Sequence, residues 1–149
     1  MEITILVVDD EPDMRQLLKR SLEPDLGCRV EMASSGEMAL KILDETHIDM
    51  VLADIKMPGM NGLELLELIK REYPDITVLM MTAFGRIETA VEAMKKGAYD
   101  FITKPFDHDA LILRLQKAVE RHRLLNENRM LQKERQNTQD FQILSARAQ

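Results

Sequence analysis

Five short aliphatic runs recur along the chain, each separated from the next by a stretch of helical length. They cover residues 3–8, 29–33, 50–53, 77–81 and 100–102. Several are apolar throughout, as expected of strands buried on both faces of a parallel sheet. The segments between them show the one-face spacing of amphipathic helices. That spacing holds Met14, Leu17, Leu18 and Leu22 in the first segment, and Ile87, Ala90, Val91 and Met94 in the fourth. We therefore predict an α/β fold, an open, doubly wound domain around a five-stranded parallel sheet.

Local signals agree with these helices. Pro12 suits a first helical position, the Ser34-x-x-Glu37 pattern is a possible capping box, and Gly97 is a good helix stop after two lysines. From residue 107 a helical pattern continues through Leu111, Leu115, Ala118, Val119 and His122, which would pack a fifth helix on the sheet. At 149 residues, the chain has room for one such domain plus an extension.

Composition limits the function classes. Residues 1–110 carry 12 basic against 22 acidic side chains, and residues 111–149 carry 8 against 4, so we expect no direct binding of nucleic acid by this chain. We find no segment suited to crossing a membrane and no leader, and we expect a cytoplasmic protein. The single cysteine, Cys28, is interpreted as a buried structural thiol. His47, His108 and His122 lack ligand spacing and are assigned no role.

Polar groups follow four of the five runs. Asp9 and Asp10 come after the first, Asp54 after the third, Thr82 after the fourth and Lys104 after the fifth. Because the carboxyl ends of parallel strands meet at one edge of a sheet, three acids, a hydroxyl and an amine would converge there. Each residue alone has an ordinary explanation, such as an acid near a helix N-terminus or a solvated lysine. Their joint placement favours a chemical site.

Three neighbouring carboxylates repel one another, so such a site takes up protons or binds a cation. Oxygen ligands with room for water suit Mg²⁺ or Mn²⁺. We place the metal on Asp10, Asp54 and the backbone carbonyl of Lys56, with Asp9 reaching it through water. A free oxygen of Asp54 would then attack a phosphoryl group in line and form an acyl phosphate. Lys104 would offset charge on the transferring oxygens, and the Thr82 hydroxyl would donate to a phosphoryl oxygen after transfer.

Over residues 1–122 the chain resembles the response-regulator receiver domain of two-component signalling, because four motifs of that family occur in the right order. They are residues 7–12 (Val-Val-Asp-Asp-Glu-Pro), 54–62 (Asp-Ile-Lys-Met-Pro-Gly-Met-Asn-Gly), 81–83 (Met-Thr-Ala) and 97–106 (Gly-Ala-Tyr-Asp-Phe-Ile-Thr-Lys-Pro-Phe). The resemblance implies a flavodoxin-like sheet of strand order 2-1-3-4-5 and a cis bond between Lys104 and Pro105. Asn61 departs from the commoner aspartate of its turn without touching the chemical set.

The resemblance also implies roles and a mechanism. Asp54 would be the phosphorylated residue, Asp9 and Asp10 the metal-site acids, Thr82 the switch hydroxyl and Lys104 the phosphate-binding lysine. A sensor histidine kinase would be the phosphate donor, and the chain would catalyse its own phosphorylation and dephosphorylation while serving mainly as a switch.

The resemblance gives roles to three more residues: Phe101 would change conformation on phosphorylation, and two others would set the rate of hydrolysis. Phe101 would turn inward as Thr82 moves toward the phosphate, altering the face made by the fourth helix, fifth strand and fifth helix. Lys56 and Phe84, two residues beyond the acceptor and the threonine, would set the rate of hydrolysis. Both are bulky, so we predict a slowly decaying phosphoryl group, and a half-life of seconds would contradict this.

Residues 123–149 form a predicted linker helix that becomes a polar tail. Leu124, Asn128 and Leu131 have coiled-coil spacing, with the asparagine at a register-setting position. A frayed, solvated helix is the alternative. Residues 120–131 (Glu-Arg-His-Arg-Leu-Leu-Asn-Glu-Asn-Arg-Met-Leu) resemble the linker of sigma-54-dependent activators of the nitrogen-regulation type. In these an ATPase and a DNA-binding domain follow. We therefore expect a homodimer through the fifth helix and linker, and a fragment whose transcription-activating effector is missing.

Three other interpretations remain to be compared. A dehalogenase-type phosphatase uses a strand-end aspartate but needs a second acid where Lys56 stands. A flavodoxin-like cofactor module needs a hydroxyl- or glycine-rich phosphate loop after the first strand, where Asp9 and Asp10 would repel a flavin phosphate. A receiver that serves only as a phosphorylation-independent dimerisation module keeps the fold but would not need the complete site.

Overall fold

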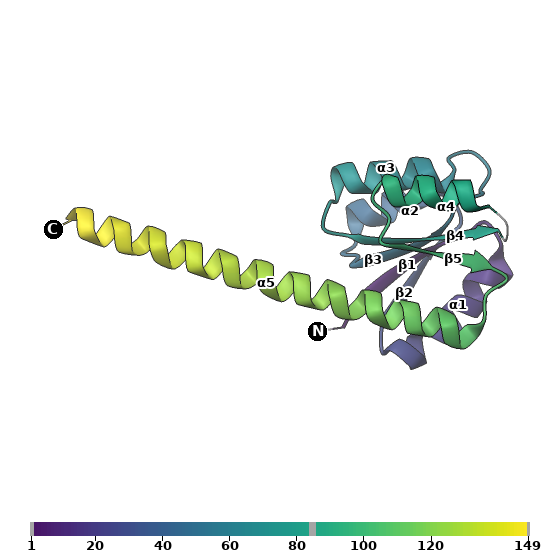
Figure 1. The fold of residues 1–149 in the computed structure, drawn as a ribbon, viewed down its shortest axis with the longest axis horizontal. Coiled ribbons are helices and arrows are strands. Elements are labelled where there is room, and N and C mark those ends of the chain that lie inside the picture. Colours follow the sequence, from purple (N-terminus) through teal and green to yellow (C-terminus); the bar gives the residue numbers. More distant parts are fainter. Residues whose placement is uncertain (1, 84–85, 149) are drawn as a thin grey trace.

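A computed structural model describes the backbone of residues 2–83 and 86–148, and within these ranges the side chains as far as residue 131. Strands and helices alternate along the chain (Figure 1). The strands are β1 (Thr4–Val8), β2 (Arg29–Ala33), β3 (Met50–Asp54), β4 (Thr77–Ala83) and β5 (Asp100–Lys104). The helices are α1 (Pro12–Leu26), α2 (Gly36–Glu45), α3 (Gly62–Glu72), α4 (Ile87–Lys95) and α5 (His108–Ala148). All strand pairs are parallel, in the order β2-β1-β3-β4-β5, so the predicted fold and strand order are confirmed.

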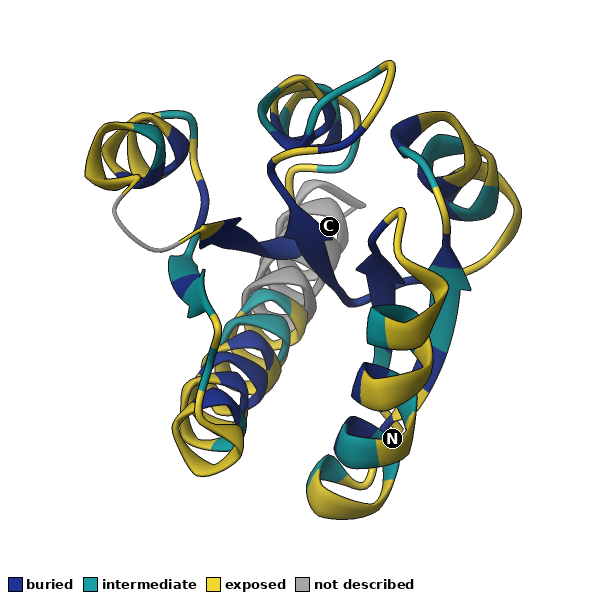
Figure 2. Cartoon of the chain, turned by 90° about the vertical axis from the view of Figure 1, so that its right-hand side faces the viewer, coloured by how far each residue is buried: buried dark blue, intermediate teal, exposed yellow. Residues whose placement is uncertain are grey.

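The sheet is covered on both faces. Alternate side chains of one strand point to opposite faces, and in β1 Leu6 and Val8 join one core cluster while Ile5 and Val7 join the other. The first cluster is completed by α2, α3 and α4, and the second by α1 and α5. Figure 2 shows the inner strands of the sheet buried between these helices and the outer strands partly exposed, while the outward surfaces of the helices are exposed wherever their side chains are described. Burial on both faces explains why the three inner strands, β1, β3 and β4, are almost entirely apolar, whereas the outer strands β2 and β5 are partly exposed and carry charged residues.

Helices α1 and α2 begin close to the positions that the sequence predicted, but the capping residue of α2 differs. Helix α1 begins at Pro12, as predicted. The capping-box prediction was wrong by one residue, because Ser35 rather than Ser34 accepts the hydrogen bond from the Met38 amide. The Glu37 carboxylate instead accepts from the backbone N–H of Met60, at 3.3 Å. A side chain three residues before the amide it caps is the usual geometry, and Ser35 has it for Met38.

The stop at Gly97 was predicted correctly, whereas the buried face of α4 was not. Gly97 has φ +107°, a left-handed conformation that favours glycine, just after α4 ends. Within α4 only Ala90 of the expected apolar set is buried, together with Ala93. The others, Ile87, Val91 and Met94, are 74%, 46% and 41% exposed. Helix α4 therefore approaches the sheet through small side chains and presents its larger apolar residues outward.

A smaller correction applies to α1, where Leu18 and Leu22 are buried but Leu17 is 52% exposed. Cys28 is buried, as predicted.

Helix α5 is continuous from His108 to Ala148 and extends away from the sheet in its C-terminal half (Figure 1). Its predicted packing side chains are all buried: Leu111, Leu115, Ala118, Val119 and His122. Within the described residues, no helix joins the length of a membrane span to the necessary apolarity. The division of the chain between residues 122 and 123 stays a prediction, since the helix runs through it without a break.

Candidate functional site

The predicted convergence of strand ends is present in the sheet register. Val8 pairs with Ala53, so the next residues, Asp9 and Asp54, lie side by side at the carboxyl edge. On the other side of β3, Asp54 itself pairs with Met81. One step further along β4, Thr82 pairs with Thr103 and Ala83 with Lys104. The sheet thus brings the acids, the hydroxyl and the amine to one edge.

The three acids form a compact oxygen cluster. Asp9, Asp10 and Asp54 each contribute a carboxylate oxygen, and these atoms all lie within 4.8 Å of one another. Asp9 and Asp54 are buried, whereas Asp10 is exposed. Hard oxygen donors with access to water are the ligands that Mg²⁺ and Mn²⁺ prefer, so the residues fit the predicted divalent cation. The proposed ligation by the Lys56 carbonyl remains a prediction.

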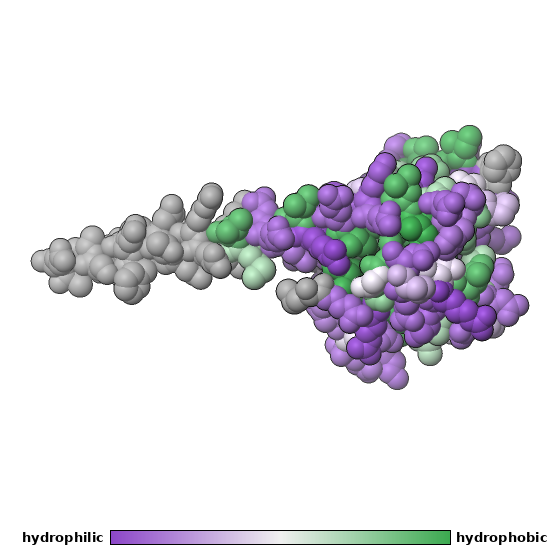
Figure 3. Space-filling model, turned by 90° about the horizontal axis from the view of Figure 1, so that it is seen from below, coloured by the Kyte–Doolittle hydropathy of each residue, from purple (hydrophilic) through white to green (hydrophobic). Residues whose placement is uncertain are grey.

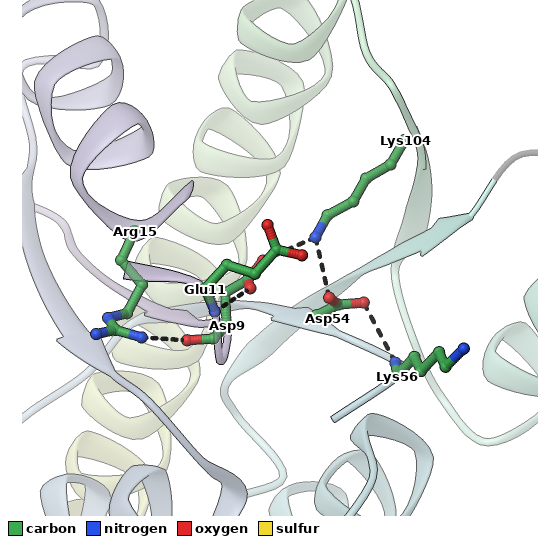
Figure 4. Close-up of polar contacts among 6 residues, drawn as sticks. All are labelled: Asp9, Glu11, Arg15, Asp54, Lys56 and Lys104. Carbon is green, nitrogen blue, oxygen red and sulfur yellow. Dashed lines mark hydrogen bonds and ion pairs between the residues drawn. The ribbon is translucent and has the colours of Figure 1, made fainter. Parts of the chain in front are cut away.

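Backbone contacts hold Asp9 in place. Its side-chain Oδ1 accepts from the Glu11 amide at 2.9 Å, and its carbonyl oxygen accepts from Arg15 Nη1 at 2.7 Å (Figure 4). Pro12 places these two residues at the start of α1, where the chain turns back from β1. A buried residue held through both its carboxylate and its backbone carbonyl is pre-positioned for its neighbours.

Lys104 bridges two of the acids. Its Nζ donates to Asp9 Oδ2 at 2.8 Å and to Asp54 Oδ2 at 2.9 Å (Figure 4). The remaining oxygen of Asp54, Oδ1, accepts from the Lys56 amide at 3.2 Å. Both oxygens therefore have a partner, and each still has a second lone pair directed elsewhere. The Lys104–Pro105 peptide bond is cis, as the resemblance implied.

The electrostatic balance of the site remains negative, since one ammonium group faces three carboxylates. Burial raises the pKa of Asp54, and the charge of Asp9 adds to this, while the hydrogen bonds from Lys104 and the Lys56 amide act in the opposite direction. For Lys104, burial lowers the pKa but the hydrogen bonds to Asp9 and Asp54 prevail and raise it. A cation beside Asp54 would favour its ionised form.

A cavity of about 860 Å³ opens in front of Asp54. Thr82 and Lys56 line it, as the predicted roles require, and so do Arg86 and Thr89, which sequence reasoning did not single out. Thr82 is buried and Phe101 is half-buried. The other rate-tuning residue, Phe84, lies outside the described residues. In the sequence, the one sign that Arg86 belongs to the site was its position four residues after Thr82.

Gly62 is a second residue whose importance the sequence did not reveal. Its amide donates to the Ile55 carbonyl at 2.7 Å. A Cβ atom there would lie 2.3 Å from the Asp54 carbonyl oxygen, which no relaxed structure accommodates. Asn61, beside it, caps α3 by accepting from the Glu64 amide at 2.9 Å. The asparagine thus performs a capping role that aspartate also fills, which explains why this departure from the commoner motif leaves the fold intact.

Comparison with known proteins identifies the family. The sequence model of one protein family, the response regulator receiver domain, matches residues 5–116. The chain belongs to this family. The receiver domain is 44% identical over 128 residues to a putative response regulator NtrX-like protein of Rickettsia bellii, covering 85% of this chain and 27% of that protein. It is 44% identical over 129 residues to the nitrogen assimilation regulatory protein NtrX of Azorhizobium caulinodans, covering 85% and 28%.

A solved structure agrees with these relatives. The receiver domain of NtrX from Brucella abortus superposes with a TM-score of 0.73 at 43% identity, covering 78% of this chain and 98% of that one. The predicted resemblance to a receiver domain of the nitrogen-regulation type is confirmed. Membership of this family decides against the phosphatase and flavin-module interpretations. The chain spans only about a quarter of the length of the full regulators it matches, 27% and 28% for the two above.

Proposed function

We propose that this receiver domain accepts a phosphoryl group on Asp54 from a sensor histidine kinase and uses it to control an effector that activates transcription. The observation that carries the proposal is the meeting of Asp10, Asp54 and Lys104 in the lining of one cavity, with the buried Asp9 bonded to Lys104 behind them. Catalysis of phosphoryl transfer consists mainly of positioning and charge stabilisation, and this arrangement supplies both.

In the proposed step, an Asp54 carboxylate oxygen forms a new P–O bond while the bond from phosphorus to the donor imidazole nitrogen breaks, and the imidazole leaves after taking up a proton. A Mg²⁺ or Mn²⁺ ion held by Asp9, Asp10, Asp54 and the Lys56 carbonyl would offset the negative charge that gathers there. Lys104 moves its hydrogen bond from Asp54 to a phosphoryl oxygen, and remains bonded to Asp9. Thr82 then donates its hydroxyl proton to another phosphoryl oxygen.

The output of the switch would pass through Phe101 and α5. The backbone carbonyl of Phe101 accepts from Arg114 Nη1 of α5 at 3.0 Å, so this helix is tied to β5 at the residue whose ring would turn. We propose that Lys56 and Phe84 slow the hydrolysis of the phosphoryl group. Phosphorylation shifts the equilibrium only by the difference between its contacts in the two states.

We further propose that α5 and the linker join two copies of the chain. Leu124, Met130 and Leu131 are 58%, 57% and 52% exposed, and Asn128 is exposed beside them. Figure 3 shows apolar side chains among hydrophilic ones where α5 leaves the domain. A second copy would cover this stripe, since exposed leucines at coiled-coil spacing pair with their equivalents. In this view the domain acts in the cytoplasm, beside its kinase, and contact with DNA belongs to the effector. The sigma-54 activator context rests on the linker resemblance.

The test is intact-mass spectrometry after incubation with Mg²⁺ and acetyl phosphate. We expect one phosphoryl adduct on the parent, none on Asp54→Asn, and none when a chelator removes the metal. The control is Asp109→Asn, an exposed acid in the first turn of α5, which should be modified like the parent. Absence of an adduct, together with failure to bind a beryllofluoride analogue, would overturn the proposal and favour a phosphorylation-independent dimerisation module.

A further inference from the structure

A second polar cluster lies at the opposite edge of the sheet, where the strands begin. Asp49 directly precedes β3, Thr77 is the first residue of β4, and His122 of α5 reaches both. They are 7%, 4% and 3% exposed. We name these three residues the far-edge cluster. Burying a carboxylate costs free energy unless it is paired and hydrogen-bonded, so the partners of Asp49 are needed to keep it in the folded protein.

The contacts of Asp49 tie four segments together. Its Oδ2 accepts from the Thr4 amide of β1 at 2.9 Å, and its Oδ1 lies 3.0 Å from His47 Nε2 and 3.5 Å from His122 Nε2. Its backbone carbonyl accepts from the Thr77 amide at 3.2 Å. Burial acts to raise the pKa of Asp49, but the hydrogen bonds from His122, Thr4 and His47 outweigh it and lower the pKa to about 2. The carboxylate is therefore ionised and held.

His122 is the only member of the cluster on α5, and it is fixed from two directions. Its Nδ1 lies 3.0 Å from Thr77 Oγ1, opposite the nitrogen that faces Asp49. Asn126, one turn later, is 3.2 Å from the same Nε2. Arg129, almost one further turn on, pairs with Asp75 in the loop before β4 at 3.2 Å. Helix α5 is thus fastened to the amino edge of the sheet just where the exposed linker residues begin.

The strands held by this cluster are those that carry the acceptor site. β3 begins directly after Asp49 and ends at Asp54, and β4 runs from Thr77 to Ala83, so that it includes Thr82. β3 and β4 are each paired with a strand on either side, so one continuous hydrogen-bonded ladder joins the residues at the two ends of these strands. A displacement at the carboxyl ends of β3 and β4 would therefore be passed to the residues that hold α5.

We propose that the far-edge cluster is a positioning latch that fixes the direction in which the linker helix leaves the domain and passes the state of Asp54 to it. The direction of the linker is the part that holds in the unmodified protein, and the transmission rests on the proposed phosphorylation. His122 is a positioning residue, since it acts on α5 and touches no reacting atom.

The experiment measures the distance between spin labels on α2 and α5 in the full chain, with Lys41→Cys and Glu127→Cys as attachment sites on exposed positions. Cys28 is buried and its pKa is raised to about 11 by burial, so it reacts slowly with the label. Dilution with unlabelled chain removes distances between copies. The variants are His122→Phe, which keeps the ring volume, and His122→Gln, which keeps a polar group. Each is compared with the parent before and after acetyl phosphate.

The matched control is His108→Phe. His108 is the first residue of the same helix and pairs with Asp25 at 2.9 Å, but both side chains are about half exposed, at 49% and 45%. We expect the His122 variants to broaden the distance distribution and to lose its shift on phosphorylation. The extent of Asp54 modification should stay unchanged by mass spectrometry, and His108→Phe should match the parent throughout.

Each alternative outcome has a definite meaning. A parent-like narrow distribution in both folded His122 variants would overturn the latch. A broadened distribution that still shifts like the parent on phosphorylation would overturn the transmission. If the parent takes up no phosphate, the proposed function fails, yet the unmodified distributions still decide whether the latch sets the linker direction.

Discussion

Replacing Lys104 by methionine tests whether the acceptor site is held by its ion pairs. The variant keeps a long side chain and removes the ammonium group that bonds Asp9 at 2.8 Å and Asp54 at 2.9 Å. The Asp9 side chain is fully buried and that of Asp54 is 11% exposed, so the two carboxylates left behind have little access to water. Removing one partner of a fully buried pair costs about 3–5 kcal/mol.

The expected loss lies somewhat below that range. The Lys104 side chain is 19% exposed and the site opens into a cavity, so water will solvate the abandoned acids in part. We expect the free energy of unfolding to fall by about 2–3 kcal/mol in a chelator, measured by urea denaturation. Saturating Mg²⁺ should reduce the difference from the parent to about 1 kcal/mol or less, because the variant lacks the competing ammonium group, binds the cation more tightly than the parent, and is therefore stabilised more by it.

Two results would refute this reasoning. A loss below about 1 kcal/mol in chelator would mean that the pairs contribute no more than surface pairs do. An equal loss with and without Mg²⁺ would mean that the cation does not lie among these acids. The control is Lys96→Met, which also removes a lysine with two carboxylate partners, Glu67 and Glu92, but at the surface. It should change stability much less and show no dependence on Mg²⁺.

Two other predictions concern the far edge and the acceptor backbone. Because the pKa of Asp49 is lowered from 3.8 to about 2 on folding, its stabilisation is complete above its unfolded value and is lost as the pH falls toward 2. Asp49→Asn should therefore cost about 2 kcal/mol in urea unfolding near neutral pH and progressively less in acid, and a constant difference would contradict it. Gly62→Ala should lower stability by about 1–3 kcal/mol and slow phosphorylation, because the new Cβ meets the Asp54 carbonyl at 2.3 Å. Gly36→Ala, whose Cβ meets the flexible Met60 side chain, is the control and should be milder in both assays.

The strands and most of the site could be predicted from sequence because topology does the long-range work. Asp9 and Lys104 are 95 residues apart, yet both follow apolar runs, and parallel strands bring such positions together. The strand ends were placed too early, since β4 continues to Ala83 and β5 to Lys104. The backbone ladder continues wherever the neighbouring strand offers partners, regardless of side-chain polarity. Thr82 and Lys104 are therefore held within the sheet rather than after it.

The helical period of the apolar residues did not predict which side chains of α4 are buried. Ile87, Val91 and Met94 have helical spacing, but the period alone does not say how close the helix axis lies to the sheet. Here the contact is made by Ala90 and Ala93, whose small side chains permit a close approach. The larger residues are then left on the outer surface. How closely a helix approaches the sheet is a tertiary property, which its own sequence period does not encode.

His122 was predicted to pack on the sheet but was assigned no chemical role, because the three histidines lack ligand spacing. Its partner Thr77 is 45 residues away in the sequence. The strand-end argument that found the acceptor site applies equally to strand beginnings, and Asp49 and Thr77 both stand where runs begin. Polar residues that stand at the beginnings of apolar runs are therefore also expected to meet at one edge of the sheet. The histidine itself carried a signal, since it falls on the buried stripe of α5 with Leu115 and Val119.

The two edges of the sheet differ in how completely their charges are matched. At the far edge one carboxylate meets two imidazoles and a backbone amide, and the Thr77 hydroxyl bonds one of these imidazoles. No buried side-chain nitrogen or oxygen among the described residues lacks a partner. At the acceptor edge three carboxylates meet one ammonium group. A fold that can satisfy its buried groups but leaves an excess of like charge at one place holds that charge for a ligand. In the proposed function this imbalance would give a cation, and with it a phosphoryl group, a site there, and the fully paired far edge would connect the strands of that site to α5.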